Sequence, residues 1–175
     1  MAGPMYKLNI KMNKDDLMLL NSIDKKVVLV KENSESSGNS NGFIDEVAWV
    51  TFQLWGDNKV TWKNEYSVYA SENSQLATNS IENNYYKPEI SEITQSVKVG
   101  EKLYEANPIN AMTVSNDEQA YFIPIEKIKV FLAARAENGK VISVAQSQAL
   151  LLDFTEKPET TITYDRNTSK FVIKK

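Results

Sequence analysis

The chain has 175 residues, of which 42% are hydrophobic, so it is long enough to bury the core of one domain. It carries 20 Lys and Arg residues against 23 Asp and Glu, and this formal charge of -3 gives no basic field to attract nucleic acids. The absence of cysteine and histidine excludes disulfides, thiolate nucleophiles, Ser-His-Asp triads and metal sites built on those ligands. We expect a single domain over residues 1–175, with no nucleic-acid partner and no cofactor.

The start of the chain, Met1 to Lys7, has no basic segment followed by an apolar one, so we expect no secretory signal. Apolar runs are also far shorter than the ~18 residues that a membrane helix needs. These features predict a soluble protein, either cytoplasmic or released.

Short segments rich in β-branched and aromatic residues recur between polar turns, which is typical of antiparallel sheets rather than of alternating strands and helices. The sequence therefore predicts an all-β fold, an antiparallel β-sandwich of Greek-key or jelly-roll type with at most one short N-terminal helix. The expected strands span residues 6–12, 27–31, 47–54, 60–70, 109–114, 121–125, 128–134, 141–145, 150–154, 160–164 and 171–173.

The helix is expected over Lys14 to Ser22, where Asn13 is a suitable N-cap and two aspartates stand in the first turn. An extended connector is the alternative for this segment. If the helix forms, its inward-facing residues are expected to be Leu17, Met18 and Leu20.

Two polar stretches interrupt the strands, at residues 32–42 and at residues 71–96. The first has no apolar residue and is expected to be a surface loop. The second carries Tyr85 and Tyr86 in its middle, and long excursions of this kind are functional or disordered.

Two hairpins are predicted in the second half of the chain. Asn138-Gly139 suits a type I′ turn between residues 128–136 and 140–145. Residues 165–169 have the composition of a turn between the strands at 160–164 and 170–174, a hairpin that would close one sheet edge.

The best candidate site is an aromatic strip on residues 47–55. Alternation places Trp49, Thr51, Gln53 and Trp55 on one face of that strand, where indoles are suited to stack on a sugar ring or contact a protein. The alternative to a binding role is a structural one, in which Trp49 lies beneath a loop and Trp55 lies at the end of the strand. Trp62 is expected in the core. Three tyrosines complete the candidate ligand-binding set: Tyr69, Tyr85 and Tyr86.

Catalytic and metal-binding patterns are weak. Asp165, Asn167 and Ser169 have the alternate spacing of a calcium loop, but the glycine and distal glutamate of an EF-hand are missing, so we expect a plain turn and no metal. No phosphate-binding glycine loop or GxSxG motif is present, and sequence alone cannot select a catalytic carboxylate pair. We expect no catalytic residues and no enzymatic activity.

These observations favour a lectin-like binding or assembly module whose partner is a carbohydrate or a protein. One alternative is a toxin-like, membrane-active protein in which residues 71–99 form a pore-lining hairpin, although their alternation is poor. The other is a self-associating structural protein or homo-oligomer, against which the lysines at the C-terminal strand argue.

Overall fold

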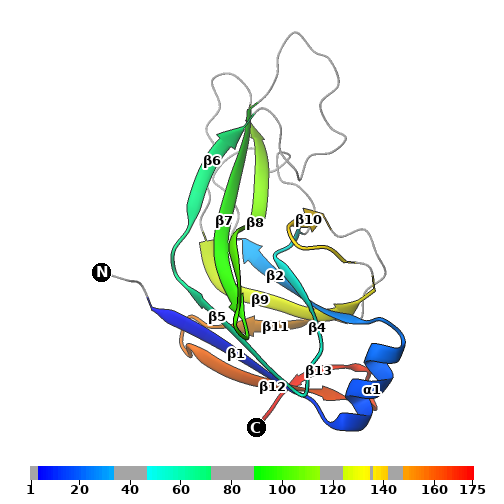
Figure 1. Ribbon diagram of the computed structural model, residues 1–175. Coiled ribbons are helices and arrows are strands. Elements are labelled where there is room, and N and C mark those ends of the chain that lie inside the picture. Colours follow the sequence, from blue (N-terminus) through cyan, green and yellow to red (C-terminus); the bar gives the residue numbers. More distant parts are fainter. Residues whose placement is uncertain (1–3, 34–46, 72–88, 115–123, 135, 142–147) are drawn as a thin grey trace.

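The computed structural model describes residues 4–33, 47–71, 89–114, 124–134, 136–141 and 148–175, and it confirms the all-β class with one N-terminal helix (Figure 1). The elements are β1 (Met5–Lys11), α1 (Lys14–Ser22), β2 (Lys26–Asn33), β3 (Val47–Ala48), β4 (Val50–Gln53), β5 (Asp57–Lys63), β6 (Ser67–Ser71), β7 (Glu89–Val99), β8 (Lys102–Val114), β9 (Pro124–Ala133), β10 (Lys140–Val141), β11 (Leu150–Asp153), β12 (Glu159–Asp165) and β13 (Lys170–Ile173).

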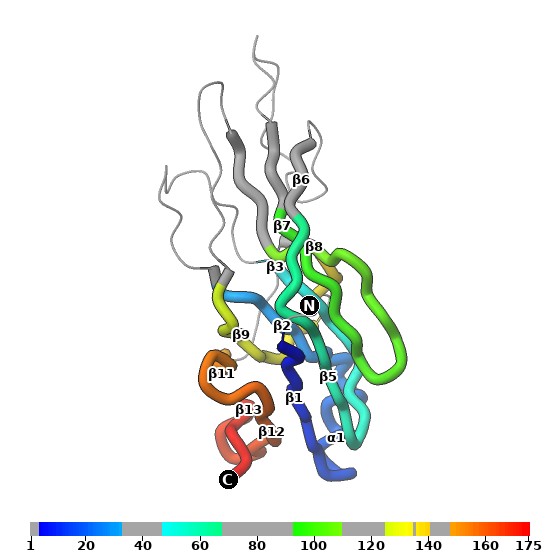
Figure 2. The backbone as a smooth tube through the Cα atoms, turned by 90° about the vertical axis from the view of Figure 1, so that its left-hand side faces the viewer, coloured from blue at the N-terminus to red at the C-terminus, as the bar shows by residue number. Residues whose placement is uncertain are grey.

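Two main sheets make up the fold. The larger, seven-stranded sheet has the order β13-β12-β1-β5-β7-β6, with β8 also paired to β7, and the four-stranded sheet has the order β11-β9-β2-β4. A short third pair joins β10 to β3. The larger sheet is mixed, because β1 and β12 run in parallel, whereas its other described pairings are antiparallel. Figure 2 shows the long β7–β8 hairpin running beside β5 and β6.

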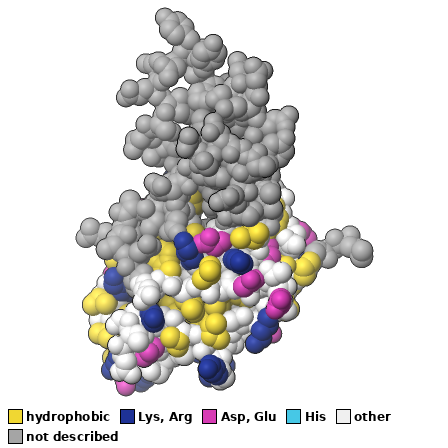
Figure 3. Space-filling view, turned by 180° about the vertical axis from the view of Figure 1, so that it is seen from behind, with side chains coloured by type: hydrophobic (Ala, Val, Ile, Leu, Met, Phe, Trp, Pro, Cys, Tyr) yellow, Lys and Arg dark blue, Asp and Glu magenta, His cyan; other side chains and the backbone are white. Residues whose placement is uncertain are grey.

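The core lies between the two main sheets because their strands alternate inward apolar and outward polar residues. Leu8 and Ile10 of β1 belong to one buried cluster with Leu29 of β2 and Val130 of β9, and all four are fully buried. Burying each such side chain contributes about 1.5–3 kcal/mol. On the part of the surface that is coloured in Figure 3, charged side chains of both signs lie among hydrophobic ones.

Helix α1 forms over the predicted residues. The side-chain oxygen of Asn13 accepts the backbone N–H of Asp16 at 2.8 Å, as an N-cap does. Leu20 is buried and Leu17 packs against the core, but Met18 is exposed, so its predicted inward orientation is wrong. The reason is geometric: consecutive helical residues are 100° apart, and Met18 lies beyond the narrow face shared by Leu17 and Leu20. Within the described part of the chain, no helix is long and apolar enough to cross a membrane.

The predicted strand at residues 60–70 is two strands, β5 and β6, separated at residues 64–66. The sequence does not predict strand β7, because the polar composition of residues 71–96 is typical of a loop. Ile93, Thr94 and Gln95 are all buried in succession, so the period-two alternation that identifies a strand is absent there. Residues 89–99 pair instead with three neighbouring strands.

Of the two predicted hairpins, β12–β13 is confirmed, with Asp165 opposite Lys170 and β13 at a sheet edge. The hairpin at Asn138-Gly139 is wrong. Gly139 has the expected positive φ of 67°, but β10 pairs with β3 and not with β9. The residues after the turn are bonded to β3 instead, since the N–H of Gly139 donates to the carbonyl oxygen of Ala48 at 2.7 Å and Lys140 and Val141 pair with Ala48 and Val47.

Candidate functional site

An open groove of about 510 Å³, here called the Trp55 groove, lies where β4 passes into β5 beside the β7–β8 turn. Its lining includes three predicted site residues, Thr51, Gln53 and Trp55. The indole of Trp55 is 65% exposed at this groove, and Tyr104 of β8 provides a second aromatic ring. The groove therefore combines apolar ring surface with neighbouring polar side chains.

The backbone of Trp55 is fixed by a buried amide. Asn58 accepts the N–H of Trp55 at 3.0 Å and donates to the carbonyl oxygen of Trp55 at 2.7 Å. The preceding residue, Leu54, is fully buried, and its carbonyl oxygen accepts from Asn21 of α1 at 3.4 Å. The exposed indole is thus attached to an ordered turn whose flanking groups are bonded.

Charged groups of both signs surround the indole. Lys26, Lys59 and Lys102 line the Trp55 groove together with Asp57 and Glu101. The ammonium group of Lys102 lies 4.8 Å from the ring centroid of Tyr104, a cation–π contact that orients both side chains. The groove therefore offers hydrogen-bond donors and acceptors within reach of an apolar ring.

Trp49 does not belong to this surface, which corrects its assignment as a ligand-binding residue. Its side chain is 0% exposed, and its indole N–H donates to the carbonyl oxygen of Gln95 at 2.9 Å. The strand is interrupted at Trp49, between β3 and β4, so the simple alternation from residue 47 to residue 55 does not hold. Trp49 and Val50 consequently belong to the same core cluster.

The predicted tyrosines are only partly placed. Tyr69 lies on β6, opposite Glu92 of β7 in the strand register. Tyr85 and Tyr86 lie outside the described residues. Trp62 is buried in the core, as the sequence indicates.

A buried ion pair, which was not predicted, lies inside the sandwich. The ammonium group of Lys31 on β2 is 2.7 Å from Glu126 Oε2 on β9, and both side chains are buried. Trp62 Nε1 donates to the same carboxylate oxygen at 3.1 Å, and the Tyr66 hydroxyl donates to Glu126 Oε1. The carboxylate is therefore satisfied by three donors.

Aromatic rings enclose the Lys31 ammonium group. Its Nζ lies 5.3 Å from the ring centroid of Trp49, 5.7 Å from that of Trp62 and 5.6 Å from that of Tyr66. Burial lowers the pKa of Lys31, and the nearby Glu126 carboxylate opposes this effect. Burial, together with the hydrogen bond to Glu126, raises the pKa of the Tyr66 hydroxyl.

A signal for this pair exists in the sequence. Lys31 follows Val27 and Leu29 at alternate positions of an apolar strand, and Glu126 precedes Ile128 and Val130 in the same way. Two opposite charges at inward positions of separate hydrophobic strands indicate a buried ion pair.

Among the described residues, no cluster of three or more acidic side chains is arranged to hold a metal ion. Both carboxylate oxygens of Asp165 accept hydrogen bonds within the β12–β13 turn, from Asn167 N–H and from the Thr168 hydroxyl.

Comparisons with protein-family models, with curated proteins and with solved structures find no match to the chain. The geometry of the chain itself is therefore the basis for a functional proposal.

Proposed function

We propose that this protein is a non-enzymatic binding module that takes a carbohydrate in the Trp55 groove. The observation that carries the proposal is the exposed indole of Trp55, whose backbone is held in place by Asn58. A large apolar ring left in water is poorly solvated, and covering it with the apolar face of a sugar ring is favourable.

The ordered turn supports binding because a backbone that is already fixed loses little freedom when a ligand arrives. Asn58 holds both the N–H and the carbonyl oxygen of Trp55, so the turn needs no rearrangement. The volume of about 510 Å³ is within the usual range of small-molecule sites.

The polar lining supports a hydroxylated ligand over a purely apolar one. Gln53 is exposed beside the indole, and Lys59 and Asp57 supply a charged donor and a charged acceptor. Sugar hydroxyls both donate and accept hydrogen bonds, and charge-assisted bonds of this kind are the stronger ones. Aromatic stacking combined with such groups fixes the orientation of a sugar ring.

A glycan-array screen tests the proposal. We expect the folded protein to bind a defined set of glycans and Trp55→Ala to lose them, since truncating one exposed side chain changes stability by only about 0.5 kcal/mol. Leu151→Ala is the matched control, because Leu151 is 54% exposed on β11, outside the groove. Retained binding in Trp55→Ala, or no binding by the folded protein, would overturn the proposal.

A further inference from the structure

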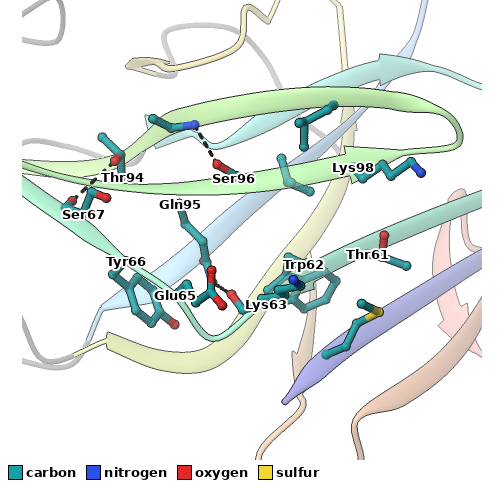
Figure 4. A pocket seen from close by; sticks show the side chains of 14 residues that line it. Thr61, Trp62, Lys63, Glu65, Tyr66, Ser67, Thr94, Gln95, Ser96 and Lys98 are labelled. Carbon is teal, nitrogen blue, oxygen red and sulfur yellow. Dashed lines mark hydrogen bonds between the residues drawn. The ribbon is translucent and has the colours of Figure 1, made fainter. Parts of the chain in front are cut away.

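A second groove, here called the Tyr66 groove, opens between β5, β6 and the β7–β8 hairpin (Figure 4). β5 pairs with β7 as far as Trp62 opposite Val97, and β6 resumes the pairing at Ser67 opposite Thr94. The chain between these two strands diverges from β7 and leaves a space of about 510 Å³. Neighbouring residues of β8 separate the two grooves, since Leu103 lines the Tyr66 groove and Tyr104 the Trp55 groove.

Gln95, a lining residue of the Tyr66 groove, has an unsatisfied polar atom. The residue is only 2% exposed, and its side chain reaches from β7 toward β5, where Nε2 donates to the carbonyl oxygen of Lys63 at 2.7 Å (Figure 4). A carbonyl oxygen can only accept, so the orientation of the amide is fixed. Oε1 then faces away from Lys63, and no donor within the described parts of the chain reaches it. A buried acceptor left unpaired costs about 1–3 kcal/mol.

The backbone is also strained at this groove. Ala106 has a positive φ of 47°, and its N–H donates to the Ser96 hydroxyl oxygen at 3.0 Å. Both residues line the groove, and the β7–β8 register shifts between Gln95 and Val97. Backbone strain of this kind concentrates at binding sites, where the surrounding structure maintains it.

The charges beneath the groove are already balanced. Trp62 and Tyr66 line the groove and both donate to Glu126, whose charge is neutralised by Lys31. The lining also includes the charged residues Lys63, Glu65 and Lys98, but all three are exposed to solvent. A charged ligand at the buried amide of Gln95 would therefore lose its hydration without gaining a buried counter-charge there. At the mouth, Met5 and Leu103 expose apolar side chains.

We propose that the Tyr66 groove binds a small uncharged ligand that donates an N–H or O–H group to Gln95 Oε1 and places an apolar body against Leu103 and Met5. This site is separate from the Trp55 groove and does not depend on the carbohydrate proposal.

The test uses two-dimensional NMR of the ¹⁵N-labelled protein, in which each tryptophan indole N–H gives its own signal. The probes are benzamide and benzyl alcohol, which are uncharged donors, and benzoate and benzylammonium, their charged counterparts. We expect the neutral probes to shift the Trp62 indole signal while the Trp55 signal stays, and the charged probes to bind at least about tenfold more weakly.

Two variants locate the ligand. Gln95→Met removes the acceptor at similar length, together with the hydrogen bond that Nε2 donates to Lys63. Leu103→Ala removes an exposed part of the apolar wall without touching the core. We expect both to weaken benzamide binding by about tenfold, with Leu151→Ala as the control. Leu103→Ala keeps the test valid if Gln95→Met disturbs the fold.

Three results would each overturn the proposal. They are no signal shift at the highest soluble probe concentration, equal binding of charged and neutral probes, and signal shifts that map outside the groove. Trp55→Ala is expected to retain benzamide binding. A blank glycan array therefore leaves the Tyr66 groove unaffected, and the two proposals fail independently.

Discussion

The ammonium group of Lys31 and the carboxylate of Glu126 are both removed from water, and this is costly for each charge alone. We expect Glu126→Gln, which keeps the shape of the side chain, to lower the free energy of unfolding by about 3–5 kcal/mol, because it leaves the buried ammonium group without a counter-charge. Urea denaturation followed by tryptophan fluorescence measures this loss.

The exposed pair of Lys127 and Asp153, 3.9 Å apart, supplies the control. We expect Asp153→Asn to cost under about 1 kcal/mol, as for exposed ion pairs generally. A loss in Glu126→Gln no larger than that in Asp153→Asn would show that the buried pair is not important for stability.

The Tyr66 hydroxyl gives a pH-dependent prediction. Its pKa in the folded protein is raised above the ordinary value of 10.0, so the stability it contributes is complete below pH 10.0 and is lost as the pH rises further. We expect the difference in unfolding free energy between the wild type and Tyr66→Phe to narrow above pH 10.0.

Urea denaturation on either side of pH 10.0 measures the difference, and Tyr164→Phe, on β12, controls for the loss of a hydroxyl. A difference that stays constant across pH 10.0 would contradict the role assigned to the Tyr66 hydroxyl.

At the level of elements, two glycine turns form a matched pair. Gly100 and Gly139 have φ of 60° and 67°, but a Cβ on Gly100 meets nothing within 4 Å, whereas one on Gly139 meets Pro108 Cδ at 2.9 Å. We expect Gly100→Ala to cost about 1–2 kcal/mol through backbone strain, and Gly139→Ala to cost about 1–3 kcal/mol more through overpacking. Equal losses in urea denaturation would contradict the Pro108 contact.

Elements with local signals could be predicted from sequence, and elements set by distant contacts could not. Asn13 caps α1 three residues from its bonding partner, and residues 165–169 join strands that follow one another directly. The partner of β10 is β3, nearly a hundred positions away along the chain, which no turn composition reveals. Strand β7 could not be predicted because Thr94 and Gln95 are buried but polar, and polar residues in succession are typical of a loop.

The residues of the candidate site also divide into those with a local sequence signal and those placed by distant contacts. Thr51, Gln53 and Trp55 could be grouped from sequence because they alternate along one segment. Tyr104 reaches the groove from β8, and Asn58 fixes the backbone of Trp55 through contacts visible only in the folded chain.

For the molecule as a whole, the architecture places two grooves near the turn of one hairpin, β7–β8. The Trp55 groove has an exposed indole among charged side chains, whereas the Tyr66 groove ends at a buried amide above a neutralised ion pair. We therefore expect ligands of different chemistry at the two grooves.

The most direct test of the carbohydrate proposal is an NMR titration with the glycan that binds most strongly on the array. The titration follows the indole N–H signals of the 3 tryptophans. Trp55 is 65% exposed, whereas Trp49 and Trp62 are buried and hydrogen-bonded. The proposal predicts a saturable shift of the Trp55 signal, with the Trp49 and Trp62 signals unchanged. Glycan binding that leaves the Trp55 signal in place would contradict it.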